Sequence, residues 1–215
     1  MADEHVDATL PFLTSVVRAM VRLQRLTGMR PCEVVMMRPC DIDRTGDAWV
    51  YQPATHKNLW RGHQRLVPRG PKAQEILKPF LDRPAEAFIF SPAESEKQRH
   101  VEQRTKRKTP MTPSQARRKP KAKPKRAKRD RYDTASYQRA IDYAVLAANK
   151  RRKENEPEIP VWFPLQLRHT RATEVRRQYG LDGAQSALGH KNANVTEVYA
   201  EKNLELAVRI AKETG

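Results

Sequence analysis

Residues 188–203 read LGHKNANVTEVYAEKN. Gly189 can take the left-handed backbone conformation that ends many helices, and the KNAN run after it favours a turn. We therefore expect a helix that ends at Gly189, a turn, and a short helix that carries Tyr199. A buried core does not select a Gly-His pair, a polar turn and a single tyrosine in this order, so the stretch is a candidate functional segment.

Charge is concentrated in one part of the chain. The 215 residues carry a formal net charge of +17, with a pI near 10.2. The segment from Lys97 to Arg131 holds 16 Lys and Arg residues and two acidic residues, so most of the net charge lies there. A basic segment of this kind favours nucleic acid as the partner. A ribosomal protein, or a basic tail that a chaperone covers, is the alternative.

Cysteine content and hydropathy indicate where the protein works. Cys32 and Cys40 lack the spacing of metal ligands and form no disulfide framework, which fits a reducing compartment. No apolar run approaches the roughly 20 residues that span a membrane, and the chain does not open with a secretion signal. We expect a cytoplasmic protein that has no membrane partner.

Hydrophobic spacing predicts a mainly α-helical fold with a small antiparallel β-sheet. Apolar residues recur at helical spacing up to Gly28, at Phe12, Val16, Met20 and Leu23. Pro31 suits the first position of a second helix, PCEVVMM. Residues 48–53 (AWVYQP) and 64–68 (QRLVP) are typical of two strands that flank the loop THKNLWRGH. Residues 71–81 predict another helix.

The second half of the chain begins with a break in this pattern. From Ser91 to Asp130 there are too few apolar residues to offset ordering entropy, so we expect a disordered basic insertion at about residues 92–131. A helix capped by Asp133 or Thr134 follows. The remaining helices are expected from Pro164 to Gly180, up to Gly189, around Tyr199, and over the last residues of the chain.

Four motifs occur in a fixed order. They are LTGMRPCEVVMMRPCDID at residues 26–43, HK at 56–57, LQLRHTRATEV at 165–175, and LGHKNANVTEVYAE at 188–201. This ordered set resembles the catalytic domain of the tyrosine recombinases, the phage integrase family. The resemblance covers nearly the whole chain, residues 1–215, apart from the basic insertion. It implies the catalytic-domain fold of DNA breaking and rejoining enzymes, with duplex DNA as the partner.

The resemblance also implies a catalytic role for five residues. Arg30 and Arg168 match the two arginines that bind the non-bridging phosphate oxygens, and Lys57 matches the general acid for the departing 5′ oxygen. His190 would donate to the same phosphate, and Tyr199 would form the covalent 3′-phosphotyrosyl link. These residue types suit the reaction, because arginines can stabilise the developing negative charge. We therefore expect no metal ion and no cofactor.

One position departs from the family pattern. The pattern H-x-L-R-H-T has a histidine three residues before the second arginine, and Leu165 occupies that place here. Leucine cannot accept the nucleophile's proton, so a slow recombinase is one expectation. A DNA-binding protein that has lost turnover is a second, and a type IB topoisomerase is a third. His169 is expected to pack, and Glu33 to orient a neighbour.

Domain content and assembly are the last expectations. Family members usually grip DNA between a core-binding domain and the catalytic domain. This sequence starts where the catalytic domain starts, so we expect the N-terminal core-binding domain to be absent. Leu204, Val208 and Ala211 form a short apolar stripe on the last helix, which predicts a monomer in solution and assembly with other recombinase protomers on DNA.

Overall fold

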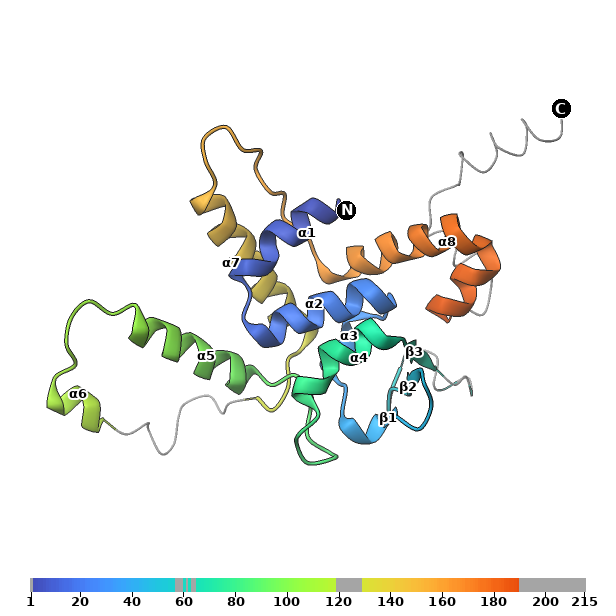
Figure 1. Cartoon of the computed structure of the whole chain (residues 1–215), viewed down its shortest axis with the longest axis horizontal. Helices are drawn as coiled ribbons and strands as arrows, with labels where there is room; N and C mark the ends of the chain where they lie inside the picture. Colours follow the sequence, from blue (N-terminus) through green and yellow to red (C-terminus); the bar gives the residue numbers. More distant parts are fainter. Residues whose placement is uncertain (1, 57–59, 61, 63–64, 119–128, 190–215) are drawn as a thin grey trace.

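The expected mixture of many helices and one small antiparallel sheet is confirmed (Figure 1). The structure is a computed structural model, and it describes residues 2–56, 60, 62, 65–118 and 129–189. Of the expected catalytic residues, Lys57, His190 and Tyr199 lie outside the described residues. The same is true of the helices predicted after Gly189.

The helix before Gly28 ends where the sequence predicts, whereas the next helix ends two residues before the end of the predicted PCEVVMM stretch. Helix α1 spans Asp3–Thr9, a 3₁₀ turn covers Leu10–Phe12, and α2 spans Ser15–Thr27. Helix α2 ends at Gly28, whose φ of 63° is the left-handed conformation that glycine adopts without steric cost. Three residues later Pro31 begins α3, Pro31–Val35. The short helix α1 was not predicted.

The sheet contains three short antiparallel strands in the order β1-β2-β3. They span Ile42–Asp43, Trp49–Tyr51 and Val67–Arg69. The predicted hairpin is therefore present as β2 and β3, and β1 adds a further strand. Alternation along residues 65–69 buries every second side chain, Arg65, Val67 and Arg69. Helix α4, Pro71–Leu77, follows the sheet.

The basic insertion differs from the expectation of disorder over part of its length. Helix α5 spans Pro92–Thr105 and α6 spans Pro113–Arg117 (Figure 1). Helix α5 is anchored on α2, because Ser95 and Thr14 share a hydrogen bond of 2.8 Å and the Ser15 N–H donates to Gln98 at 2.8 Å. Composition alone missed these polar anchors, since they bury little apolar surface.

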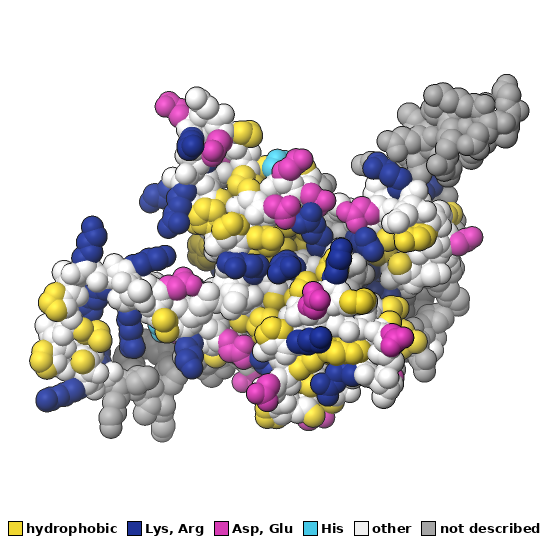
Figure 2. Space-filling model, viewed as in Figure 1, with side chains coloured by type: hydrophobic (Ala, Val, Ile, Leu, Met, Phe, Trp, Pro, Cys, Tyr) yellow, Lys and Arg dark blue, Asp and Glu magenta, His cyan; other side chains and the backbone are white. Residues whose placement is uncertain are grey.

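The two helices form a limb that extends away from the helical body (Figure 1). Residues 92–118 carry eight Lys and Arg residues and three Glu residues. Figure 2 shows Lys and Arg side chains along this limb and across the middle of the same face of the molecule. The described part of the insertion is therefore a basic projection with a fixed base.

The hydrophobic core takes residues from α2, α3, the sheet, α4 and α7, with Leu167 from α8. Helix α7 spans Thr134–Arg151 and is capped by Asp133, as expected, and α8 spans Pro164–Leu188 with a break at Gly180. Gln24 is buried at their junction and donates to the carbonyls of Met29 and Pro164, at 3.1 and 2.9 Å, while the Tyr137 hydroxyl donates to it. This satisfied polar contact fixes the first turn of α8 against the end of α2.

Candidate active site

The first site residue, Arg30, is held in place by its own helix. It is the residue before α3, and its backbone N–H donates to Oε2 of Glu33 at 2.7 Å. Its guanidinium donates to Oε1 of the same carboxylate at 2.9 Å. The Arg30 side chain is 24% exposed, so the guanidinium is fixed by Glu33 and still reaches the surface.

Glu33 is a fully buried carboxylate surrounded by arginines. Nε of Arg65 donates to Oε1 of Glu33 across 3.3 Å, and Arg65 is itself buried. Burial opposes the ionisation of Glu33. The charge of Arg65, the Arg30 backbone N–H, and the charges of Arg30 and Arg168 outweigh burial, so the pKa of Glu33 is lowered. Glu33 is therefore ionised at neutral pH and orients its neighbours, as the sequence indicated.

The second predicted arginine, Arg168, lies on α8 and is 1% exposed. Its guanidinium donates to the carbonyl of Gly28 at 2.6 Å and to the carbonyl of Leu188 at 2.9 Å. Gly28 is two residues before Arg30, so these bonds bring the two predicted arginines to the same end of α2. Arg168 therefore joins the end of α2 to the end of α8.

Glycine is required where these elements meet. A Cβ at Gly28 would lie 2.8 Å from Cδ2 of Leu188 and 3.2 Å from Cγ of Arg171. A Cβ at Gly189 would collide with Nη1 of Arg65. Both glycines also have φ near +60°, at 63° and 64°. The neighbouring side chains lie close to both glycines, and both have left-handed φ, which explains why the two motifs carry glycine there.

We call Arg30, Glu33, Arg65 and Arg168 the arginine cluster. Three guanidiniums and one carboxylate give the cluster a net charge of +2. The four side chains come from the start of α3, the residues just before β3, and α8. Of the five predicted catalytic residues, the structure describes Arg30 and Arg168 and brings them together. Gly189, the residue before His190, lies against Arg65. Lys57, His190 and Tyr199 themselves are outside the described residues.

Sequence reasoning did not select Arg65. The signal was the alternation of QRLVPR, which puts Arg65 on the same strand face as Val67. A charged residue at an inward strand position needs a partner, because an isolated buried charge is costly. Glu33 is that partner here.

The neighbours of Arg168 on α8 have distinct environments. Leu165 is 38% exposed, at the start of the helix. Oε1 of Gln166 accepts the Phe163 N–H at 2.9 Å, so Gln166 caps the first turn of the helix. Burial, and then the charge of Arg168, lower the pKa of His169, which favours its neutral form.

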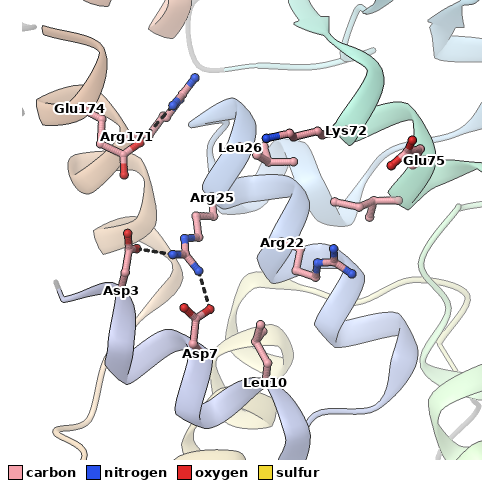
Figure 3. Close-up of a pocket in the computed structure, with 11 residues that line it drawn as sticks. Asp3, Asp7, Leu10, Arg22, Arg25, Leu26, Lys72, Glu75, Arg171 and Glu174 are labelled. Atoms are coloured by element: carbon pink, nitrogen blue, oxygen red, sulfur yellow. Dashed lines mark hydrogen bonds and ion pairs between the residues drawn. The ribbon is translucent and has the colours of Figure 1, made fainter. Parts of the chain in front are cut away.

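A separate hollow of about 680 Å³ lies between α1, α2, α4 and α8 (Figure 3). Its walls carry acidic and basic side chains in equal number, unlike the arginine cluster. Arg25 is paired there with Asp3 at 2.9 Å and with Asp7 at 2.6 Å, and Arg171 with Glu174 at 3.0 Å. This balance of charge makes the hollow a poor anion site.

Metal sites and membrane spans are both absent from the described part of the chain. No group of three or more His, Cys, Asp or Glu side chains there could hold a metal ion. No helix among the same residues is long and apolar enough to cross a membrane.

The fold is shared with solved recombinase structures. The XerA recombinase is 17% identical with a TM-score of 0.56, and the match covers 100% of this chain and 65% of XerA. The Tn1549 transposon integrase in complex with a circular intermediate DNA is 14% identical with a TM-score of 0.61, and the match again covers 100% and 65%. The XerH site-specific recombinase, bound to its difH substrate, is 17% identical with a TM-score of 0.52, over 98% of this chain and 53% of XerH.

The chain thus spans between about half and two thirds of the length of these recombinases. A search of curated proteins found no match. The model of the phage integrase family matches residues 11–205, which include all five predicted catalytic positions. The chain belongs to the phage integrase family.

Proposed function

We propose that this chain is the catalytic domain of a site-specific DNA recombinase that cleaves and rejoins strands through a 3′-phosphotyrosyl intermediate. The observation that carries the proposal is the arginine cluster, which joins Arg30 and Arg168 around one end of α2. The DNA complexes of the XerH recombinase and the Tn1549 integrase support DNA as the partner.

The charge of the arginine cluster fits the proposed reaction. A phosphodiester carries one negative charge, and attack by a tyrosinate gives a five-coordinate phosphorus with two negative charges. The net +2 of the cluster matches that transition state better than the ground state, which is the condition for catalysis. Arg30 would donate to a non-bridging oxygen from its partly exposed position. Buried Arg168 would hold the ends of α2 and α8 together through its bonds to Gly28 and Leu188.

The remaining residues complete the step. Oη of Tyr199 would form the bond to phosphorus while the bond from phosphorus to the 5′ oxygen breaks. Lys57 would give its proton to that oxygen, and His190 would donate to the phosphate. The proton of Tyr199 would leave to solvent, since Leu165 cannot accept it. The phosphotyrosyl bond keeps the energy of the broken phosphodiester, so a 5′ hydroxyl can reverse the step without ATP.

The exposed Leu165 supports a second candidate function. Without a base at this position, the chain would act as a DNA-binding protein of the same fold that cleaves rarely or never. The two candidates differ in whether a covalent bond to DNA forms, and they agree on duplex DNA as the partner.

Covalent capture tests the proposal. Nicked duplexes with randomised sequence around the nick lose a short strand on cleavage, which traps the protein on DNA. A denaturing gel would then show an adduct with the unaltered chain and with Tyr179→Phe, a control at an exposed tyrosine on α8. Tyr199→Phe would bind DNA equally and give no adduct. An adduct with Tyr199→Phe would contradict the assignment, and binding without any adduct would favour the second candidate.

We also propose that protomers assemble on DNA and not in free solution. The apolar stripe that the sequence predicts over residues 204–211 is short, and a stable dimer usually buries well over about 1,000 Å². Light scattering without DNA should give the mass of one chain, 24.8 kDa. A dimer at micromolar concentration would contradict this.

A further inference from the structure

Arg65 belongs to the arginine cluster through Glu33, although none of the four quoted motifs contains it. Its side chain is 4% exposed, and Nε donates to Oε1 of Glu33 across 3.3 Å. Nη1 donates weakly to the Leu66 carbonyl, at 3.4 Å, and buried Nη2 has no hydrogen-bond partner among the residues that the structure describes. Arg65 is therefore a buried charge, and Glu33 is the carboxylate that compensates it.

The other end of the Arg65 side chain faces the end of α8. Gly189 lies so close that a Cβ there would overlap Nη1, and it would lie 3.1 Å from Cζ and 3.3 Å from Cδ of Arg65. Arg65 thus contacts the residue immediately before His190. On its opposite side it contacts Glu33, which holds Arg30 by both backbone and side chain.

We propose that Arg65 is a positioning residue: it ties Glu33, and through Glu33 the phosphate-binding Arg30, to the point where the chain leaves α8 toward His190. The assignment of a phosphate to this place rests on the proposed function. The contacts among Arg65, Glu33 and Gly189 do not.

The chemistry of the site explains why this residue is an arginine. A lysine would supply the charge but lacks the planar guanidinium, whose Nε reaches Glu33 while Nη1 lies close to Gly189. An apolar residue would leave Glu33 buried with fewer compensating charges, and burial would then raise its pKa. A protonated Glu33 would accept fewer hydrogen bonds, so Arg30 would lose its fixed position.

A pH measurement on the folded chain tests the contact without any DNA. Charged and titratable groups that act with Glu33 come from every element around it: Arg30, Cys32, Tyr51, Arg65, Arg69 and Arg168. The pKa of Glu33 is lowered on folding. The stability that it contributes is therefore full above its unfolded pKa and is lost as the pH falls through its folded pKa.

In Arg65→Met the folded pKa of Glu33 rises, so this loss of stability should begin at higher pH. Chemical denaturation from pH 3 to 7 would show the shift relative to Arg44→Met, an exposed charge between β1 and β2. Glu33→Gln removes the titrating carboxylate. The double variant Arg65→Met/Glu33→Gln should therefore show the same pH dependence of stability as Glu33→Gln alone. Equal pH profiles for Arg65→Met and Arg44→Met would overturn the inference.

Cleavage gives the second readout. Arg65→Met should lower the single-turnover rate of adduct formation at least tenfold, with DNA affinity within threefold of the parent, and should move the acid limb of the pH–rate profile upward. Arg65→Lys keeps the charge. It should therefore return the acid limb of the pH–rate profile toward that of the parent more fully than it restores the rate. If the parent forms no adduct while the stability profiles shift as stated, the proposed function fails and the Arg65 contact stands. A normal rate and acid limb in Arg65→Met would refute the positioning role.

Discussion

Arg168 donates a guanidinium N–H to the carbonyl of Gly28 at 2.6 Å, between residues 140 apart in sequence. This bond joins the two motifs that carry the predicted arginines, because Gly28 precedes Arg30 by two residues. The contact requires a close approach of α8 to the end of α2, which only a residue without a side chain permits.

Gly28→Ala should therefore destabilise the fold. The added Cβ meets Leu188 at 2.8 Å, and the left-handed φ of 63° costs a further strain. We expect a loss of about 2–4 kcal/mol in chemical denaturation, from the combination of backbone strain and overpacking. Gly62→Ala is the matched control, since Gly62 has a φ of 70° with no atom within 4 Å of the added Cβ. Equal losses in both variants would show that the contact with α8 contributes nothing.

Replacing Arg69 should stabilise the fold, whereas Gly28→Ala should destabilise it. It is fully buried, 4.5 Å above the Tyr51 ring, and no carboxylate is paired with it among the described residues. Burial lowers the pKa of Arg69 to about 9. We expect Arg69→Met to raise the free energy of unfolding at pH 7 by about 1–3 kcal/mol, because it removes a buried charge that lacks a counterion.

The pH dependence of that gain has a defined direction. A base whose folded pKa is lowered makes the charged native state unfavourable, and stability rises as the pH increases through about 9. The advantage of Arg69→Met over the parent should thus shrink above pH 9. A variant less stable than the parent at pH 7 would mean that the cation–π contact with Tyr51 outweighs the cost of burial.

The basic limb should contribute affinity without sequence preference. The base of α5 packs on α2, so the informative change replaces the Lys and Arg residues of 106–129 with Gln and leaves α5 intact. Binding should weaken, and the slope of log K against log salt should fall by about 0.9 for each phosphate that the limb no longer neutralises. Preference among DNA sequences should stay, since base edges carry it. An unchanged slope, measured by fluorescence anisotropy, would show that the limb does not contact DNA.

Leu165→His tests the departure from the family pattern. If the missing base limits the rate, the histidine should raise single-turnover adduct formation by about 10² or more, with a pH dependence that titrates near neutrality. Leu165→Met, which adds no base, should leave the rate unchanged. No gain from the histidine, with DNA affinity and stability intact, would show that proton removal is not the slow step.

Local signals predicted much of this fold. Helical spacing located α2 and α7, Gly28 and Pro31 marked the boundary between α2 and α3, and strand alternation located β2 and β3. These elements were predictable because neighbouring residues determine them. The motifs likewise indicated Arg30 and Arg168, which the structure brings together.

What the sequence did not predict depends on contacts between distant residues. Helix α5 is fixed by Ser95 and Gln98 against α2, which are polar contacts with no periodic pattern. Arg65 owes its place to Glu33 and Gly189, which are 32 and 124 positions away. No local rule relates such positions, so a composition that indicates disorder, or a lone arginine just before a strand, can be judged only from the folded chain.

We propose that Arg30 stabilises negative charge on the phosphate during cleavage. A methylphosphonate at the cleavage site replaces one charged oxygen with a methyl group, so the transition state carries one negative charge fewer. The measurement is the rate of adduct formation by Arg30→Gln on both substrates, with Arg44→Gln as the control. Arg30→Gln should lower the phosphodiester rate by about 10²–10³ and the methylphosphonate rate far less. An equal loss on both substrates would contradict it.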